Sequence, residues 1–203
     1  MRINRAAAVI SVALALLYPS SPGWAVNEPI ESGPVIDGTL DAPVMSVPVK
    51  LKLVRDDEER SRVLTALRST TFAAGLLLPI SPPKLSKSDL QCEVTTESVH
   101  ARKSANYEKI GPKPKTTCPR TVQLILHTTW LRYLQAGRWI PVLPEYSDSG
   151  IDRRIHRSLG IQHPCRTLRR TKWSSETVSY VVDRGQVYKG SVRAVPRFIA
   201  CSA

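Results

Sequence analysis

The sequence predicts a mainly β protein, an antiparallel β-sandwich with two disulfides that is preceded by a linker and one helix. Three observations predict this fold. From Gln91 onward, apolar and polar residues alternate in several short runs, which is typical of strands. Turn residues such as Asp183-Arg184-Gly185 separate these runs at the spacing of hairpins in antiparallel sandwiches. Four cysteines, an even number, predict two disulfides.

The N-terminal segment, residues 1–25, has the pattern of a secretory signal peptide. Arg2 and Arg5 give it a positive start, and residues 6–18 form a run of 13 without charge. This run is too short to cross a bilayer as a helix, which takes about 20 residues. Gly23 and Ala25 suit the −3 and −1 positions of a cleavage site, so we expect cleavage after Ala25. An uncleaved anchor or a buried helix is the alternative.

Export changes what the cysteines predict, because thiols outside the cell membrane tend to oxidise. Four cysteines allow three pairings, and we favour sequence neighbours, Cys92 with Cys118 and Cys165 with Cys201. Each bridge would stabilise the fold by roughly 3–4 kcal/mol through loop entropy. A zinc site is the rival interpretation, but no two cysteines have the close C-x-x-C spacing of metal sites. We therefore expect no metal and no other cofactor.

Residues 26–55 are predicted to be a flexible linker. The stretch 26–50 contains four prolines and two glycines and has no sustained period. The charge is also uneven along the chain. Residues 26–90 hold 8 Lys and Arg against 9 Asp and Glu, whereas residues 91–203 hold 19 against 8. The net charge of +12 therefore resides mainly in the cysteine-containing part.

Residues 56–90 are predicted to form a helix, over about 56–78, and a proline-rich connector. The acidic run from Asp56 to Glu59 suits the positive end of a helix dipole. Apolar residues then recur at helical spacing until Pro79 ends the run. The apolar tail of this helix is also open to a second interpretation, as the relic of another export signal.

Within residues 91–203, the run CPRTVQLILHTTWLRY (118–133) is predicted to be a central strand that packs Val122, Leu124 and Leu126 inward. The run RWIPVL contains a proline, which predicts an edge strand or a bend. Three runs from ETVSYVV to the last cysteine are predicted to be closing strands. Residues 144–172 are the least regular, and residues 149–160 within them are expected to form a short helix or a long loop.

The series CEVT, CPRTVQLIL, GRWIPV, PCRT and SVRAVPRFIAC, within residues 91–203, is similar to small secreted proteins of actinobacteria that are mostly uncharacterised. The resemblance implies secretion, an immunoglobulin-like β-sandwich and sequential disulfides on the four cysteines. No catalytic residues are known for these proteins, so the resemblance implies no enzyme activity. The chain departs from that pattern in its arginine content and in the residues between the signal and Cys92, which number about 65.

No catalytic signature is visible. The sequence has neither a G-x-S-x-G elbow nor an H-E-x-x-H motif, and oxidised cysteines provide no thiolate nucleophile. His127 with Asp148 or Asp152 is a conceivable pair, but nothing in the spacing favours it over surface histidines. The candidate histidines are His100, His127, His156 and His163. We expect a non-catalytic protein; a secreted hydrolase, or a secreted toxin or interaction factor, is the alternative.

The basic residues around the third cysteine give the main functional hypothesis. Guanidinium groups bind phosphate and carboxylate in a forked geometry, and aromatic faces such as that of Trp173 can stack on sugars or bases. We therefore expect a monomer, secreted or associated with the cell wall, whose basic loop binds anionic cell-surface polymers, acidic lipid headgroups or extracellular nucleic acid. The alternative is a loop whose charges are only solvated. The predicted anion-binding residues are Arg153, Arg154, Arg157, Arg166, Arg169, Arg170 and Lys172.

Overall fold

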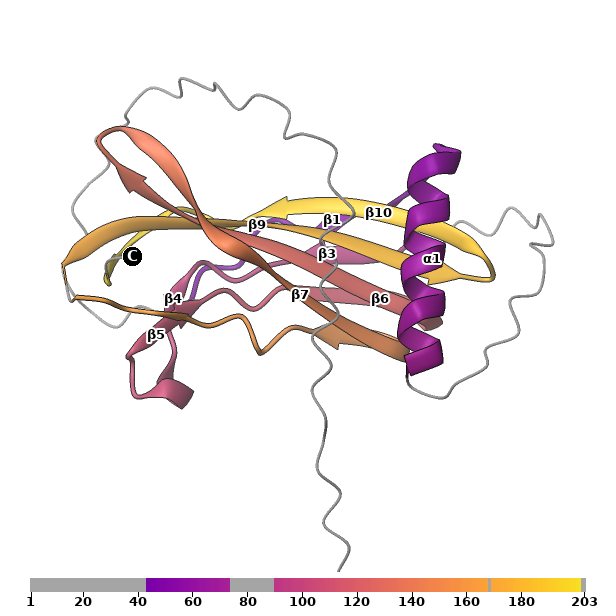
Figure 1. The fold of residues 1–203 in the computed structure, drawn as a ribbon, viewed down its shortest axis with the longest axis horizontal. Coiled ribbons are helices and arrows are strands. Elements are labelled where there is room, and N and C mark those ends of the chain that lie inside the picture. The colour runs from indigo at the N-terminus through magenta and orange to yellow at the C-terminus, as the bar shows by residue number, and fades with distance from the viewer. Residues whose placement is uncertain (1–42, 74–89, 168, 202–203) are drawn as a thin grey trace, which may run out of the picture. The chain divides into compact units, whose positions relative to one another are not determined.

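The computed structural model describes residues 43–73, 90–167 and 169–201 (Figure 1). These residues form antiparallel strands, one α-helix and two disulfides, so the predicted mainly β class is confirmed. The predicted signal peptide, the first part of the linker and the proline-rich connector up to residue 89 lie outside the described residues.

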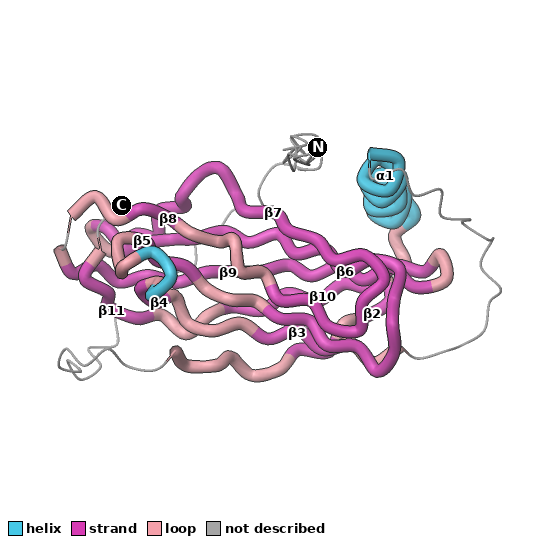
Figure 2. Tube along the Cα trace, turned by 90° about the horizontal axis from the view of Figure 1, so that it is seen from below, coloured by secondary structure: helices cyan, strands magenta, loops and turns pink. Residues whose placement is uncertain are grey.

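The strands form a large sheet and a small one (Figure 2). The large sheet has the order β1-β3-β6-β9-β10-β2, with β7 paired to β6 and β11 paired to β9. Its strands are β1 (Val49–Lys50), β2 (Lys52–Leu53), β3 (Glu93–Thr95), β6 (Lys115–Gln135), β7 (Arg138–Arg157), β9 (Arg170–Asp183), β10 (Gln186–Arg193) and β11 (Arg197–Ala200). The small sheet contains β4 (His100–Ala101), β5 (Lys109–Gly111) and β8 (His163–Pro164), and a 3₁₀ turn, η1 (Lys103–Ala105), precedes β5.

Residues 49–53 close the large sheet into a ring. Val49 in β1 pairs with Val94 in β3, and Leu53 in β2 pairs with Tyr188 in β10. Leu51 lies between these two pairings and is buried against Gly190, where a Cβ atom would come 3.1 Å from its Cδ1 atom. The structure therefore differs from the predicted linker at residues 43–55, because this segment supplies strands that cover the edges of β3 and β10.

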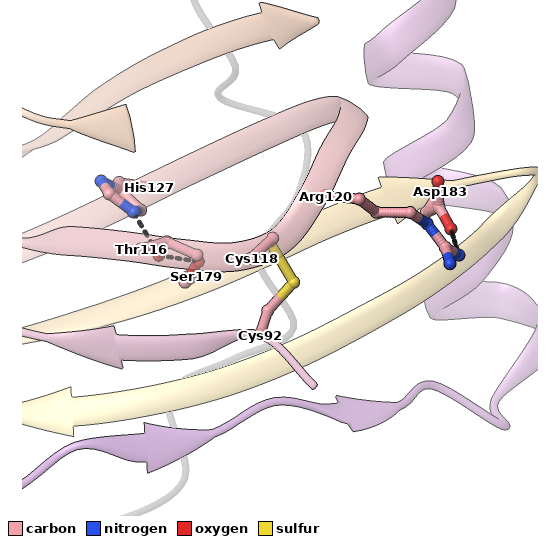
Figure 3. Close-up of a disulfide and its surroundings, with 7 residues drawn as sticks. All are labelled: Cys92, Thr116, Cys118, Arg120, His127, Ser179 and Asp183. Carbon is pink, nitrogen blue, oxygen red and sulfur yellow. Dashed lines mark hydrogen bonds and ion pairs between the residues drawn. A yellow bond between two sulfur atoms is a disulfide. The ribbon is translucent and has the colours of Figure 1, made fainter. Parts of the chain in front are cut away.

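The paired strands β6 and β7 fold back on themselves. Thr116 and His127 are hydrogen-bonded at 2.8 Å although they are eleven residues apart, which would be roughly 36 Å in a straight strand. The ladder between β6 and β7 shifts register between Thr117 and Val122. Figure 3 shows the chain reversing direction beyond Cys118, close to Arg120. The reversal stacks the two halves of these strands, and residues 149–160, expected to be a helix or a loop, belong largely to β7.

The space between the stacked halves has a polar zone between two apolar ends. Along β6, the inward residues change from Ile125 to His127 and Thr129 and then to Leu131, and all four are fully buried. Because side chains alternate along a strand, the intervening residues face outward. This differs from the prediction for Leu124 and Leu126, which lie in an outer apolar cluster while Val122 joins the inner one.

Helix α1 (Asp57–Ala73) covers part of that outer face, and its prediction is confirmed over these residues. Asp56 caps its first turn, because its Oδ1 atom accepts a hydrogen bond from the backbone N–H of Glu59 at 2.6 Å. Val63 packs against Leu124 and Val182. The carboxylate of Glu59 also accepts hydrogen bonds from side chains of β9 and β10. The helix is therefore fastened to the sheet by both apolar and polar contacts.

The predicted turn at Asp183-Arg184-Gly185 and the predicted edge strand are also observed. Ala136 and Gly137 join β6 to β7 with φ angles of 49° and 77°, and Arg184 and Gly185 join β9 to β10 with φ angles of 49° and 75°. Two successive residues of positive φ form the tight turn that antiparallel hairpins favour. Strand β7 pairs with β6 on one side and, among the described residues, has no second partner strand.

Candidate functional site

The seven predicted anion-binding residues form two separate groups. Arg153 pairs with Val122 on β6, whereas Trp173, next to Lys172, pairs with Tyr133 on the same strand. These positions on β6 are eleven residues apart, roughly 36 Å at the rise of a strand. We call Arg153, Arg154 and Arg157 the β7 cations, and Arg166, Arg169, Arg170 and Lys172 the disulfide-loop cations.

One of the three β7 cations, Arg157, is bound by a carboxylate of the protein itself, that of Glu97. Glu97 is 5% exposed, and its Oε1 atom accepts a hydrogen bond from Arg157 at 2.9 Å. Lys113 also places its Nζ atom 3.6 Å from Glu97. A buried carboxylate requires such partners, because its desolvation is otherwise costly. All three β7 cations are exposed, but Arg157 is bound to Glu97 and therefore serves the fold.

The disulfide-loop cations are positioned by the bridge between Cys165 and Cys201, which is one of the two predicted pairings. The backbone N–H of Cys165 also donates to the carbonyl of Glu108 at 2.9 Å, so the loop is tied to the segment leading into β5. A surface hollow of about 340 Å³ results there. It is lined by Glu108, Lys109, Pro164, Cys165, Arg166 and Thr167. Cations from distant parts of the sequence, Lys109 and Arg166, thus line the same hollow.

The aromatic residue beside these cations is not the one the sequence indicated. Trp173 is fully buried, and its Nε1–H donates to the carbonyl of Cys201 at 2.9 Å, so it offers no face to a ligand. Phe198 is 61% exposed instead, and it lies opposite Lys172 in the ladder between β11 and β9. The Nζ atom of Lys172 is 5.9 Å from the centroid of the Phe198 ring. Exposure alternates along residues 197–200 in the structure, but the sequence Arg-Phe-Ile-Ala has no alternation of polar and apolar residues that could have marked Phe198 as exposed.

The four histidines are not scattered over the surface, since each is at least half-buried. His100 contacts the carbonyl of Ser98, and burial is the main cause that lowers its pKa. His163 lies near Trp173, with the ring centroids 5.7 Å apart. Burial, followed by the charge of Arg166, lowers the pKa of His163.

His127 and His156 meet inside the fold, with their ring centroids 4.9 Å apart. His127 is hydrogen-bonded to Thr116 through Nε2 and to Ser158 through Nδ1, both at 2.8 Å (Figure 3 shows the Thr116 contact). Thr116 in turn contacts the hydroxyl of Ser179 at 2.8 Å. Burial lowers the pKa of His127 to about 3, with a further contribution from His156. The His127 ring is therefore neutral at physiological pH.

The carboxylate of Asp148 contacts His156, with 3.3 Å between Oδ2 and Nε2, although its partner in the β6–β7 ladder is His127. Burial alone would raise the pKa of Asp148, but the hydrogen bond and charge of His156 outweigh it and lower that pKa. The pair of Ser158 and His127 resembles a nucleophile with its base, yet both side chains are fully buried. We infer that the hydrogen bonds of His127 hold the stacked strands in register, whereas, apart from the contact with Asp148, both ring nitrogens of His156 are buried without a hydrogen-bond partner among the described residues.

The described residues contain neither a cluster of metal ligands nor a helix that could span a membrane. No group of three or more His, Cys, Asp and Glu side chains in the described part is placed to hold a metal ion. The described helix is not long and apolar enough to cross a membrane. Both disulfides of the structure are of the kind that an oxidising environment maintains.

In comparisons with known proteins, no family model, no curated protein and no solved structure matches this chain.

Proposed function

We propose that this is a secreted, non-catalytic monomer that adheres to anionic polymers of the cell surface through its disulfide-loop cations. The observation that carries the proposal is the position of these cations beside the Cys165–Cys201 bridge, where Arg166 and Lys109 line one surface hollow. Covalent fixation lowers the entropy lost when a loop binds, so fewer contacts are needed for a given affinity.

Charge supports the same partner class. Residues 91–203 carry 19 basic against 8 acidic residues, and among the described residues Glu108 is the one carboxylate that lines the hollow. Arg166 and Arg169 are exposed. Guanidinium groups bind the phosphates of teichoic-type wall polymers in a forked geometry. Such binding weakens as salt screens the charges.

Retention of the full-length protein on immobilised long-chain polyphosphate, eluted with a salt gradient, tests the proposal. The double variant Arg166→Gln/Arg169→Gln removes two disulfide-loop cations, and we expect it to elute at clearly lower salt than the parent. If both arginines contact phosphate, the slope of log K against log salt should fall by about 2.

The matched control is Arg153→Gln/Arg154→Gln, which removes the same charge from exposed positions on β7. We expect it to elute close to the parent. Equal losses in the two variants would show that retention depends on net charge alone. Unchanged elution of Arg166→Gln/Arg169→Gln would contradict the proposal.

The finer expectations from the sequence belong to this proposal and stay predictions. They are the immunoglobulin-like form of the sandwich, the kinship with small secreted proteins of actinobacteria, and export with cleavage after Ala25. Sequencing the N-terminus of the exported protein tests the last of these, because cleavage there leaves Val26 as the first residue.

A further inference from the structure

A row of four side chains crosses the sheet where β11, β9, β6 and β7 lie side by side. Phe198 pairs with Lys172, and Leu134 pairs with Trp139. Tyr133 pairs with Trp173, so Leu134 lies beside Lys172 on the neighbouring strand. Directly opposite residues of antiparallel strands share one face of the sheet. The row in spatial order is Phe198, Lys172, Leu134 and Trp139.

This row lies on the outer face. Tyr133 and Trp173 are the sequence neighbours of Leu134 and Lys172, so they face the opposite side, the interior. Their ring centroids are 5.5 Å apart there, and Trp173 is fully buried. Phe198 is 61% exposed, and the other three members of the row are half-buried. Trp130 is on the same face as Leu134, because four residues along a strand preserve the side. One face therefore presents three aromatic residues.

The surrounding charges are mainly positive. The strand segments 129–135, 138–146, 170–178 and 197–200 hold two acids, Glu145 and Glu176. Strand pairing places three of their cations on the face of the row, Arg132, Arg170 and Lys172, whereas Arg138 and Arg197 are opposite Gln135 and Trp173 and belong to the other face. One of the two acids, Glu176, is ion-paired with Arg132 and lies 3.6 Å from Arg193. Its charge is therefore neutralised within the protein. An anionic ligand meets little repulsion on this face.

We propose that this face binds single-stranded nucleic acid, with bases stacked on Phe198 and Trp139 and phosphates held by Lys172. Sheets that present aromatic side chains between cations bind single strands in this way, because every base has a face that can stack. Phe198 and Trp139 are three strands apart, roughly 14 Å, so more than one base can be accommodated. The inference deepens the proposed function and rests on it for charge, since Lys172 is a disulfide-loop cation.

A duplex, a phosphate polymer and an anionic lipid headgroup share the charge of a single strand but offer no exposed base. Binding of fluorescein-labelled oligothymidylate to the full-length protein is therefore compared with binding of an abasic strand of equal length. We expect Phe198→Ala to weaken oligothymidylate binding about 5- to 100-fold and to leave abasic-strand binding unchanged. Lys172→Gln should weaken both, because it removes a phosphate contact.

The control variant is Ile155→Ala, which removes an apolar side chain that is 46% exposed at the far end of β7. It should bind oligothymidylate like the parent, and saturating oligothymidylate should quench tryptophan fluorescence where saturating polyphosphate does not. Equal affinity for the abasic strand, or no effect of Phe198→Ala, would overturn this inference. Neither result affects the proposed function, which is tested separately by comparing polyphosphate retention of the Arg166/Arg169 and Arg153/Arg154 variants.

Discussion

Thr116 and His127 belong to the same strand, and a hydrogen bond of 2.8 Å joins the Oγ1 atom of one to the Nε2 atom of the other. The contact exists because β6 reverses direction after Cys118, where the Cys92–Cys118 disulfide holds it to the segment before β3. Asp148 and His156, in the partner strand β7, meet in the same way. A polar zone thus forms the centre of the fold.

Replacement of Thr116 by valine tests how much this zone contributes. Thr116→Val keeps the shape of the side chain but leaves His127 Nε2 and Ser179 Oγ without that hydroxyl partner. Unsatisfied buried polar groups cost about 1–3 kcal/mol each, so we expect the free energy of unfolding to fall by at least this amount. Urea denaturation with the disulfides intact measures the change.

Thr121→Val provides the matched control for that measurement. Thr121 is on the same strand but exposed, so its replacement should change the free energy of unfolding by no more than about 0.5 kcal/mol. A similar loss in both variants would mean that strand propensity, rather than the buried hydrogen bonds, determines the effect.

The ring closure by residues 49–53 leads to a second prediction. Leu51 is 6% exposed and packs in the inner cluster with Val94 and Tyr188. We expect Leu51→Ala to lower the free energy of unfolding by about 2–4 kcal/mol, because it leaves a cavity between β3 and β10. Val47→Ala, at a side chain that is 81% exposed, should have little effect. Equal stability of the two variants would show that this segment adds nothing to the core.

The sequence could not reveal this closure for a physical reason. Strands β1 and β2 have two residues each, and prolines precede them, so no alternation is long enough to detect. Their stability comes from pairing on both sides with β3 and β10, which are distant in the chain. The proline-rich composition of this segment predicts irregular structure, but pairing with the distant strands β3 and β10 overrides that local preference.

The central strand and the cysteine pairs were more accessible to prediction. Alternation over 118–133 predicts β6, and sequence order among the four cysteines favours the pairing that is observed. The reversal after Cys118 was not predictable, because a proline in a strand is equally consistent with an edge. The predicted cations separate because Arg153 is opposite Val122, whereas Lys172 precedes Trp173, which is opposite Tyr133, eleven residues further along β6.

Removal of the second disulfide should affect stability and binding together. The bridge closes a loop with a sequence separation of 36, so Cys165→Ala/Cys201→Ala should lower the free energy of unfolding by roughly 3–4 kcal/mol. It should also weaken retention on polyphosphate, because the disulfide-loop cations lose their anchor. The control, Cys92→Ala/Cys118→Ala, should destabilise to a similar degree and keep retention while folded. Unchanged retention of the first variant would contradict the role of the bridge in positioning Arg166.

Acid should destabilise the fold, starting near the ordinary pKa of histidine. Burial, then the charge of His156, lowers the pKa of His127 from 6.5 to about 3, against a smaller opposing effect of Asp148. Between these values the unfolded chain binds a proton that the folded chain does not, so the free energy of unfolding falls as pH falls. The lowered pKa values of His100 and His163 act in the same direction.

The contribution of His127 is roughly 1.4 kcal/mol per pH unit, or about 2 kcal/mol between pH 6.5 and pH 5. The side chain of His127→Gln still forms hydrogen bonds but does not titrate. The free energy of unfolding of this variant should therefore fall by about 2 kcal/mol less than that of the parent between pH 6.5 and pH 5. At neutral pH we expect the variant to be less stable than the parent. Urea midpoints of the parent and the variant at several pH values give the two slopes. Parallel slopes would show that His127 takes up a proton in the folded state as readily as in the unfolded chain, which full burial between Thr116 and Ser158 should prevent.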